Sequence, residues 1–444
     1  MQSNSWITST FGRFSGILER RNPLFFTSLT VAGLAAISSL HVAAEGFRNP
    51  PAGDFGLGRA GGKFAQVDDV TAVAHNPANL VYLPEASFSL EPTLVYIHVD
   101  YTSPTGVKSE TKDPWKLLPS FFASTPLLGG KMAAGIAVTS PYGLSNEWKQ
   151  DGAFLGPTGN LRYAAPYYTE LKTINFAPTV SVKLGEKVSL GAGFDAMWSE
   201  LTFRQYYPWF LFGGAYDGYA KARGDGTGIG ANVGLTWNLT DRQRLAATYR
   251  SPISVTYDGS LEIDSVPPAA SALGASSRVA YKTEINFPTI VGIGYGIQLS
   301  DTVRLEVDGE WLQFSNFDSL RLNIGQDAFL LPSTTIQENW KNTFTAGIGG
   351  DWAFAKNWSL RASYQYYQSP VPNSTMSTTI PDGNQEVFTV GLAWTHNRHS
   401  LSASYGGIFY DDRHITGNVN NAAFNGDYNI TVHLFSFGYR FRFL

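Results

Sequence analysis

The chain has 444 residues, of which 15% are charged and 14% are aromatic, and its formal net charge is −4 at pH 7. This mild acidic excess argues against a nucleic-acid partner, because nucleic-acid binders concentrate Lys and Arg on one face. The absence of Cys excludes a disulfide framework, a thiol nucleophile and a Cys-ligated metal.

The mean hydropathy of the chain is close to zero. A helical membrane protein would be far more apolar. The strands of a transmembrane barrel alternate lipid-facing apolar residues with lumen-facing polar ones, so their average is nearly neutral. The composition therefore favours an all-β membrane barrel.

Residues 1–44 are predicted to be a secretory signal peptide. They contain a basic region with three Arg, an apolar core over 24–40 and a small-residue cleavage site before Glu45. A transmembrane anchor is the alternative, but the apolar core falls short of the ~20 residues that a span needs. No other stretch approaches a spanning helix, so an exported chain with membrane-type strands is expected in the bacterial outer membrane.

Residues 45–85 are rich in Gly, Pro and Asn, and cannot hold one long regular element. In front of a barrel, such a segment is predicted to lie inside the lumen as a plug, here called the hatch. Asp68 and Asp69 are expected to hold it to basic lumen residues such as Arg304 or Arg361. The stretch 56–60 is expected to be flexible.

Residues 86–444 are predicted to form an antiparallel transmembrane β-barrel. Apolar residues alternate with charged ones from Val303 to Trp311, and we call their charged partners the charged row: Arg304, Glu306, Asp308 and Glu310. Charges on the lipid face cost several kcal/mol near the midplane. The charged row is therefore predicted to face the lumen.

Short turns alternate with long Gly-, Pro- and Asn-rich connections along the barrel region. The short turns lie near 128–130, 185–186, 240–242, 300–301, 355–357 and 397–398, and the long connections near 102–115, 141–168, 206–225, 258–278, 321–339, 369–385 and 411–428. Short turns are typical of the periplasmic end of an outer-membrane barrel, and long connections are typical of its extracellular end. The segments between these breaks number about fourteen strands. A β-propeller is disfavoured, because no blade-length repeat occurs.

A set of short motifs, in order, resembles the FadL family of outer-membrane long-chain fatty acid and hydrocarbon transporters. The motifs are Gly56-Leu57-Gly58-Arg59-Ala60, Asp68-Asp69, Asn76-Pro77-Ala78, Ser140-Pro141-Tyr142-Gly143-Leu144, Tyr249-Arg250-Ser251, Asn286-Phe287-Pro288, Trp311-Leu312-Gln313-Phe314, Ser369-Pro370-Val371-Pro372 and Ile380-Pro381-Asp382. The resemblance covers nearly all of the chain after the signal peptide.

The resemblance implies a fourteen-stranded barrel with an N-terminal hatch and passive uptake of hydrophobic small molecules. The hatch residues singled out are Phe47, Gly56, Gly58, Asp68, Asp69, Asn76, Pro77 and Ala78. It also implies that ligand, once captured by extracellular loops, leaves sideways through a gap made by a kink in the third strand. Gly135 occupies the place of the family's kink glycine, although it could equally lie in an ordinary strand.

An apolar run at 206–212 lies in a loop that should face water. Exposed apolar patches often mark binding sites, so the run is predicted to capture ligand; an aromatic girdle at the membrane interface is the alternative. The capture residues are Tyr207, Trp209, Phe210 and Phe212. The resemblance places a basic residue near Arg204, a candidate partner for a ligand carboxylate, which leaves fatty acid and neutral hydrocarbon both open.

An enzyme is not expected, because the His residues are scattered and no Gly-x-Ser-x-Gly elbow occurs. No cofactor, catalytic residue or metal site is predicted. The expected partners are a hydrophobic small molecule, outer-membrane lipid and the barrel assembly machinery, with the chain acting as a monomer. A general or substrate-selective aqueous porin is the nearer alternative, and a purely structural barrel or adhesin is a third.

Overall fold

The computed structural model describes residues 45–156, 158–325 and 334–443. The predicted signal peptide, residues 1–44, lies outside the described residues. The described part begins with the hatch and continues into the barrel.

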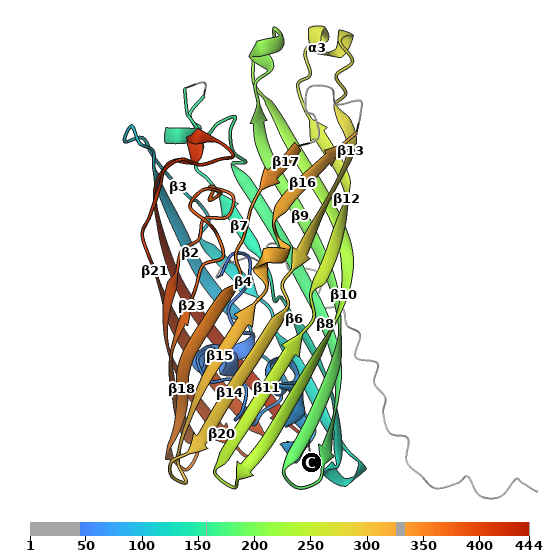
Figure 1. Cartoon of the computed structure of the whole chain (residues 1–444), viewed down its shortest axis with the longest axis vertical. Coiled ribbons are helices and arrows are strands. Elements are labelled where there is room, and N and C mark those ends of the chain that lie inside the picture. The colour runs from blue at the N-terminus through green and yellow to red at the C-terminus, as the bar shows by residue number, and fades with distance from the viewer. Residues whose placement is uncertain (1–44, 157, 326–333, 444) are drawn as a thin grey trace, which may run out of the picture. The chain divides into compact units, whose positions relative to one another are not determined.

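The barrel wall consists of antiparallel strands that hydrogen-bond to their neighbours in chain order (Figure 1). Span by span, the strands are β1 (Ser87–Leu90) and β2 (Thr93–Thr102); β3 (Lys108–Glu110), β4 (Trp115–Leu118) and β5 (Phe121–Leu127); β6 (Met132–Thr139) and β7 (Leu144–Glu147); β8 (Tyr168–Leu184); β9 (Val188–Tyr207); β10 (Gly218–Thr240); β11 (Gln243–Arg250) and β12 (Ile253–Ile263); β13 (Arg278–Phe287) and β14 (Ile290–Gln298); β15 (Val303–Leu312) and β16 (Ser319–Ile324); β17 (Thr334–Gln337) and β18 (Thr343–Ala355); β19 (Trp358–Tyr367); β20 (Gln385–His396); β21 (His399–Tyr410) and β22 (Arg413–Ile415); and β23 (Gly426–Arg442).

The wall closes because β23 pairs with β21 on one side and with β1 and β2 on the other. Closure joins the last span to the first, as a barrel in lipid requires. The predicted all-β barrel of about fourteen strands is confirmed: the described residues form a closed antiparallel barrel of 14 strands.

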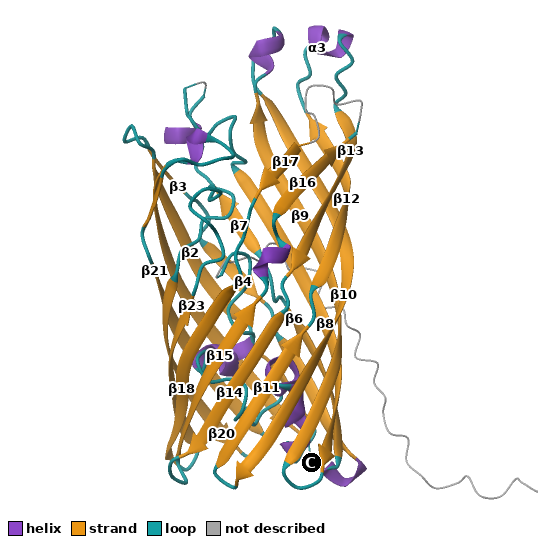
Figure 2. Ribbon diagram, viewed as in Figure 1, coloured by secondary structure: helices purple, strands orange, loops and turns teal. Residues whose placement is uncertain are grey.

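The helical elements are short, and they lie either inside the barrel or in the connections (Figure 2). They are α1 (Gly53–Gly58), α2 (Ala72–His75), η1 (Pro77–Tyr82), η2 (Leu128–Gly130), η3 (Gly152–Phe154), η4 (Trp209–Phe212), α3 (Pro268–Ala272), η5 (Phe314–Asn316) and η6 (Ala422–Phe424). None of the helices in the described part of the chain has the length and apolarity to cross a membrane.

The lower strands have apolar residues outside and polar residues inside. Large exposed apolar side chains on β18, β19 and β20 include Phe344, Ile348, Trp352, Leu360, Phe388, Val390 and Leu392. Buried polar side chains of the same wall include Glu306, Asp308, Glu310, Thr345, Gln365 and Thr389. This is the pattern of a wall with lipid outside and polar groups in the lumen.

The upper parts of β12 and β13 invert that pattern. Val255, Tyr257 and Ile285 are buried, whereas Ser254, Thr256, Asp258, Lys282 and Glu284 are exposed on the outer face. This arrangement is expected where the outer face of the wall meets water and the inner face meets an apolar interior. The inner space of the barrel is thus polar at one end and apolar at the other.

The hatch fills the lower lumen, where it appears in blue in Figure 1. One side of it is apolar: Phe55, Val73 and Leu80 belong to a buried cluster that includes Phe122, Ala133, Ala137 and Ala177 of β5, β6 and β8. Small residues on this wall let the hatch approach closely. Burying each large side chain contributes about 1.5–3 kcal/mol.

The other side of the hatch lies flush against β18 and β19. A Cβ added at Gly61 would stand 2.5 Å from the backbone nitrogen of Ile348 and also overlap the backbone oxygen of Tyr364. Both obstacles are backbone atoms of the wall, which cannot turn aside as a side chain could. Only glycine fits at this position.

We therefore expect Gly61→Ala to loosen the hatch at a cost of about 1–3 kcal/mol, the usual penalty for overpacking. The measurement is amide hydrogen exchange of the hatch in the purified protein, which should become faster. Gly309→Ala is the matched control, because the nearest atom to its added Cβ lies 3.6 Å away. Equal exchange in both variants would contradict the close approach.

Candidate functional site

One carboxylate of the wall makes several contacts with the hatch. Glu306 on β15 accepts backbone N–H groups from Phe64 at 2.6 Å, Ala65 at 2.5 Å and Gln66 at 2.8 Å. Arg59 Nη2 lies 3.2 Å from Glu306 Oε2, and both side chains are 0% exposed. A buried carboxylate needs such a complete set of donors to offset the loss of water.

The rest of the charged row continues this attachment. Asp308 Oδ2 accepts the backbone N–H of Lys63 at 2.5 Å. Glu310 lies 2.7 Å from Arg48 Nη2 and 3.4 Å from Lys63 Nζ. The prediction that the charged row faces the lumen is confirmed, and its carboxylates bind the hatch.

The predicted tethers of the hatch are confirmed in part. Asp68 Oδ2 lies 2.6 Å from Arg304 Nη1, one of the two expected partners. Asp69 pairs with Arg440 instead, at 3.0 Å. Arg361, the other expected partner, binds Asp54 at 3.1 Å. These partners come from distant strands, so only the closed barrel brings them together.

The Asn76-Pro77-Ala78 motif starts η1. Asn76 Oδ1 accepts the N–H of Ala78 at 3.1 Å and so caps the helix, with Pro77 at its first position. Asn76 Nδ2 donates to Phe64 O at 2.8 Å and to Thr236 Oγ1 of β10 at 2.9 Å. One side chain thus joins the turn, the hatch and the wall.

The expectation of a flexible stretch at 56–60 is wrong. Gly56 and Gly58 end the buried helix α1. A Cβ at Gly56 would lie 2.5 Å from His75 Nε2, and one at Gly58 would lie 2.8 Å from Ser404 Oγ. Burial lowers the pKa of His75 to about 4, so at neutral pH an uncharged ring packs beside α1. These glycines serve close packing.

An apolar cavity of about 450 Å³, here called the upper cavity, lies inside the extracellular part of the barrel. Its lining includes Leu201, Phe203, Tyr207, Ile285, Leu320 and Phe424. Pockets of this size and character suit small hydrophobic ligands.

Phe47 of the hatch lines the upper cavity and stands in an aromatic cage. Its ring is stacked on Trp340 at 4.9 Å, and the rings of Phe287, Phe314 and Phe317 lie 5.3–5.8 Å from it, edge-on. The cage closes the space between the upper cavity and the hatch.

The predicted capture residues occupy different places. Tyr207 lines the upper cavity. Trp209 is buried, and its Nε1 donates to Asp264 O at 2.7 Å, joining the β9–β10 hairpin to the connection after β12. Phe212 packs on Trp209 at 6.2 Å, and Phe210 is half exposed. Trp209 and Phe212 therefore contribute to loop packing.

Arg204 does not line the upper cavity. Its neighbours on β9, Phe203 and Gln205, do line it, so Arg204 lies on the opposite face of the strand. There its guanidinium stands 4.5 Å above the ring of Tyr168.

A lower cavity of about 110 Å³ lies between the hatch and the third span, lined by Tyr142 and by charged groups. Each Arg or Lys in its lining has an acidic partner. Arg48 and Lys63 bind Glu310, and Arg250 Nη1 lies 3.0 Å from Asp195.

The wall is interrupted between the second and third spans, at a place we call the wall gap. Pairing of β5 with β6 runs up to Phe121 and Val138, and the next link is the bridge of Thr111 with Trp148. Between them, no backbone hydrogen bond joins residues 113–120 to 140–146, all of which are described.

Residues 140–143, here called the bent segment, bond to the hatch instead of to the second span. Gly143 N donates to Phe47 O at 2.8 Å, and Asn49 N donates to Pro141 O at 3.0 Å. Arg48 and Tyr142 form an isolated antiparallel bridge. The bent segment thus turns inward because the hatch supplies its backbone partners.

Gly135 lies in the continuously paired part of β6, opposite Ser124 and Thr179. A Cβ there would lie 2.7 Å from Val73 Cγ2 and 3.3 Å from Leu80 Cδ1. In this structure the absence of a side chain at Gly135 leaves room for the hatch, and the interruption between the two spans begins beyond Val138.

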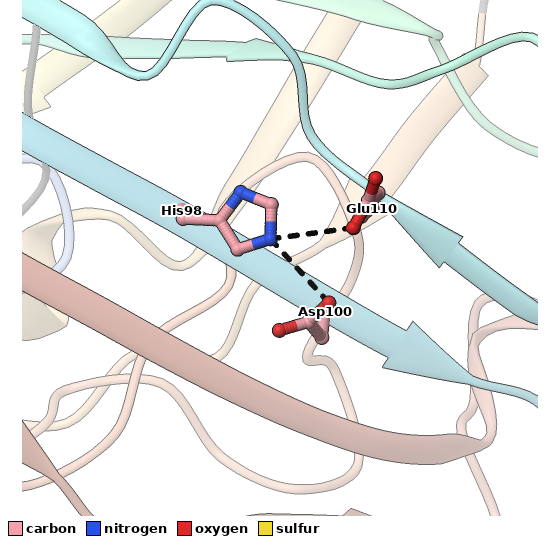
Figure 3. Close-up of side chains that lie close together, drawn as sticks. All are labelled: His98, Asp100 and Glu110. Atoms are coloured by element: carbon pink, nitrogen blue, oxygen red, sulfur yellow. Dashed lines mark ion pairs between the residues drawn. The ribbon is translucent and has the colours of Figure 1, made fainter.

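Among the described residues, one group of side chains has the closeness of a metal site: His98, Asp100 and Glu110 on β2 and β3 (Figure 3). His98 Nε2 lies 3.4 Å from Asp100 Oδ1 and 3.6 Å from Glu110 Oε2. Glu110 also forms an ion pair with Lys149. The three side chains and Lys149 therefore form one polar cluster.

Sequence reasoning does not single out two functional elements of the site. Tyr142 and its neighbours stand out in the sequence only as a motif, although Pro141 could have signalled the end of β6 pairing, because Pro cannot donate to a ladder. Glu338, which lines the upper cavity, has no signal in the sequence, because a single Glu in a long connection ordinarily faces water.

Comparison with known proteins agrees with this architecture. Residues 34–443 match the family described as outer membrane protein transport protein (OMPP1/FadL/TodX). A long-chain fatty acid transport protein of Escherichia coli O6:H1 is 25% identical over 422 residues, covering 86% of this chain and 91% of that protein. Its Salmonella typhi counterpart is 24% identical over 409 residues, with 84% and 89% covered.

Two solved structures share the fold. A Pseudomonas aeruginosa FadL homologue superposes with a TM-score of 0.77 at 20% identity, covering 90% of this chain and all of that one. The P. putida toluene transporter TodX gives a TM-score of 0.71 at 16% identity, with 89% and 99% covered. At such identities the likeness shows the fold alone.

We expect Glu306→Gln to weaken the attachment of the hatch by about 3–5 kcal/mol, since removing one member of a buried charged network leaves its partners unpaired. Amide exchange at residues 64–66 should accelerate by at least ~100-fold. Glu284→Gln, an identical change on the exposed face of β13, should have no effect. Unchanged exchange at 64–66 would show that these hydrogen bonds do not hold the hatch.

Proposed function

Because the chain belongs to the OMPP1/FadL/TodX family of outer membrane transport proteins, we propose that it carries hydrophobic small molecules passively across the outer membrane. Long-chain fatty acids and hydrocarbons are the two ligand classes that its relatives' names supply. The upper cavity supports capture, since it is apolar and lies in the part of the barrel whose outer face is polar.

The observation that carries this proposal is the position of residues 47–49. Phe47 lines the upper cavity, and the backbone of Phe47 and Asn49 bonds to the bent segment beside the wall gap. One short piece of the hatch therefore touches both ends of a possible path. A shift of this piece would open the upper cavity toward the gap.

We place the exit at the wall gap. Elsewhere in the lower wall, lateral passage would have to break backbone hydrogen bonds between strands, each costly to leave unpaired in lipid. At the gap, those bonds run inward to the hatch instead. An apolar ligand leaving there enters the bilayer directly and avoids the buried charges that hold the hatch.

The alternative is an aqueous porin, in which charged residues would line an open lumen. The carboxylates of the charged row are instead occupied by hatch donors. A porin would need a wide wet lumen at this level, and the hatch occupies it.

Uptake in a Gram-negative host lacking its own long-chain fatty acid transporter tests the function. Cells making the protein should accumulate radiolabelled oleate or toluene faster than cells with an empty vector. The purified protein in planar bilayers should give little steady ion current. A large steady current without any uptake would establish a porin and overturn the proposal.

A reversible lock tests the path. Arg48→Cys combined with Tyr142→Cys places two thiols at bridged positions, whose Cβ atoms are expected about 4.5–5.5 Å apart, and the natural chain has no Cys to interfere. We expect oxidation to suppress uptake and a reductant to restore it. Each single variant is the control and should not respond to the reductant. Full uptake by the oxidised pair would show that ligand does not pass between these segments.

A further inference from the structure

The described residues that line the upper cavity include a single acidic residue and no basic residue. Its lining residues include Tyr, Thr, Ser, Asn and Gln, but among the described ones Glu338 is the sole carboxylate, and no Lys, Arg or His occurs. A ligand anion would therefore be desolvated here without a partner, which is costly.

Glu338 is placed as a polar group in an apolar site. It is only 8% exposed. Its backbone N–H donates to Asp318 O at 2.8 Å, and its backbone oxygen accepts from Thr375 Oγ1 at 2.6 Å. The side chain has one partner among the described residues: Trp340 Nε1 donates to Oε2 at 3.1 Å.

The indole that binds Glu338 also stacks on Phe47, the hatch residue that closes the cage. Trp340 is 3% exposed and is packed among the rings of the cage. Its hydrogen bond places the carboxyl group of Glu338 close to the hatch. A polar group of this kind orients a ligand that is otherwise bound by apolar contact.

Burial raises the pKa of Glu338 to about 8, so the carboxyl is protonated at neutral pH. A protonated carboxyl both donates and accepts hydrogen bonds. It matches a hydroxyl or carbonyl oxygen, and it offers no charge to a cation.

We propose that the upper cavity selects an uncharged, mainly apolar ligand with one hydroxyl or carbonyl oxygen, and that Glu338 is the residue that recognises this oxygen. This rests on the proposed transport function and narrows its ligand class. The basic residues of the lower cavity agree with an uncharged ligand, since Arg48, Lys63 and Arg250 are already paired with carboxylates.

Equilibrium binding to the purified protein in detergent tests the proposal with four radiolabelled ten-carbon ligands: decan-1-ol, decane, decanoate and decyltrimethylammonium. Protein-free micelles correct for partition. At pH 7 we expect decanol to bind about tenfold more tightly than decane, the effect of one buried hydrogen bond. Decanoate and the cation should bind still more weakly than decane.

Three variants assign the preference to Glu338. Glu338→Leu should reduce the affinity for decanol to that for decane, whereas Glu338→Gln, which still donates and accepts, should retain most of the preference. Glu262→Leu, the same change at an exposed position of β12, should leave all four affinities unchanged. If Glu338→Leu fails to fold, the ligand series and the Gln variant still test the proposal.

Several results would overturn the proposal. Decanoate or the cation binding as tightly as decanol would reject an uncharged ligand, and a decanol preference that survives Glu338→Leu would reject the role of Glu338. Failure here is distinct from failure of the transport function: cells that take up decanoate but not decanol would retain the function and lose this inference.

Discussion

The attachment of the hatch depends on carboxylates buried inside a barrel. Glu306 receives three backbone N–H groups and the guanidinium of Arg59, and Asp308 and Glu310 extend the same contact. These groups cannot be left without partners at low dielectric. The hatch supplies their donors, and in turn the backbone N–H groups of residues 63–66 find acceptors on the wall.

The same exchange of partners explains the wall gap. Residues 140–143 give up pairing with the neighbouring strand and bond to Phe47 and Asn49. A polar backbone at this depth is tolerated only where protein covers it. The hatch and the wall gap are therefore linked. The hatch fills the lower lumen, and it also supplies the backbone partners of the bent segment beside the gap.

The reversal of polarity along the barrel creates the upper cavity. In the lower part the interior is polar and is occupied by the hatch; in the upper part β12 and β13 turn apolar residues inward, and the upper cavity forms there. Phe47 stands at the boundary of the two regions. An apolar molecule would meet a favourable environment above the hatch and a charged one within it, which favours a sideways path.

Local patterns in the sequence predict the class of fold, the number of spans, the hatch and the inward direction of the charged row, because period-two alternation and turn composition are local properties of the chain. The sequence also suggested Asp68 with Arg304. It could not decide that Asp69 meets Arg440, that Trp209 packs loops, that Arg204 faces away from the cavity or that Glu338 faces into it. These depend on closure of the barrel, which brings together strands hundreds of residues apart, and alternation alone does not say which face is inside once the wall leaves the membrane.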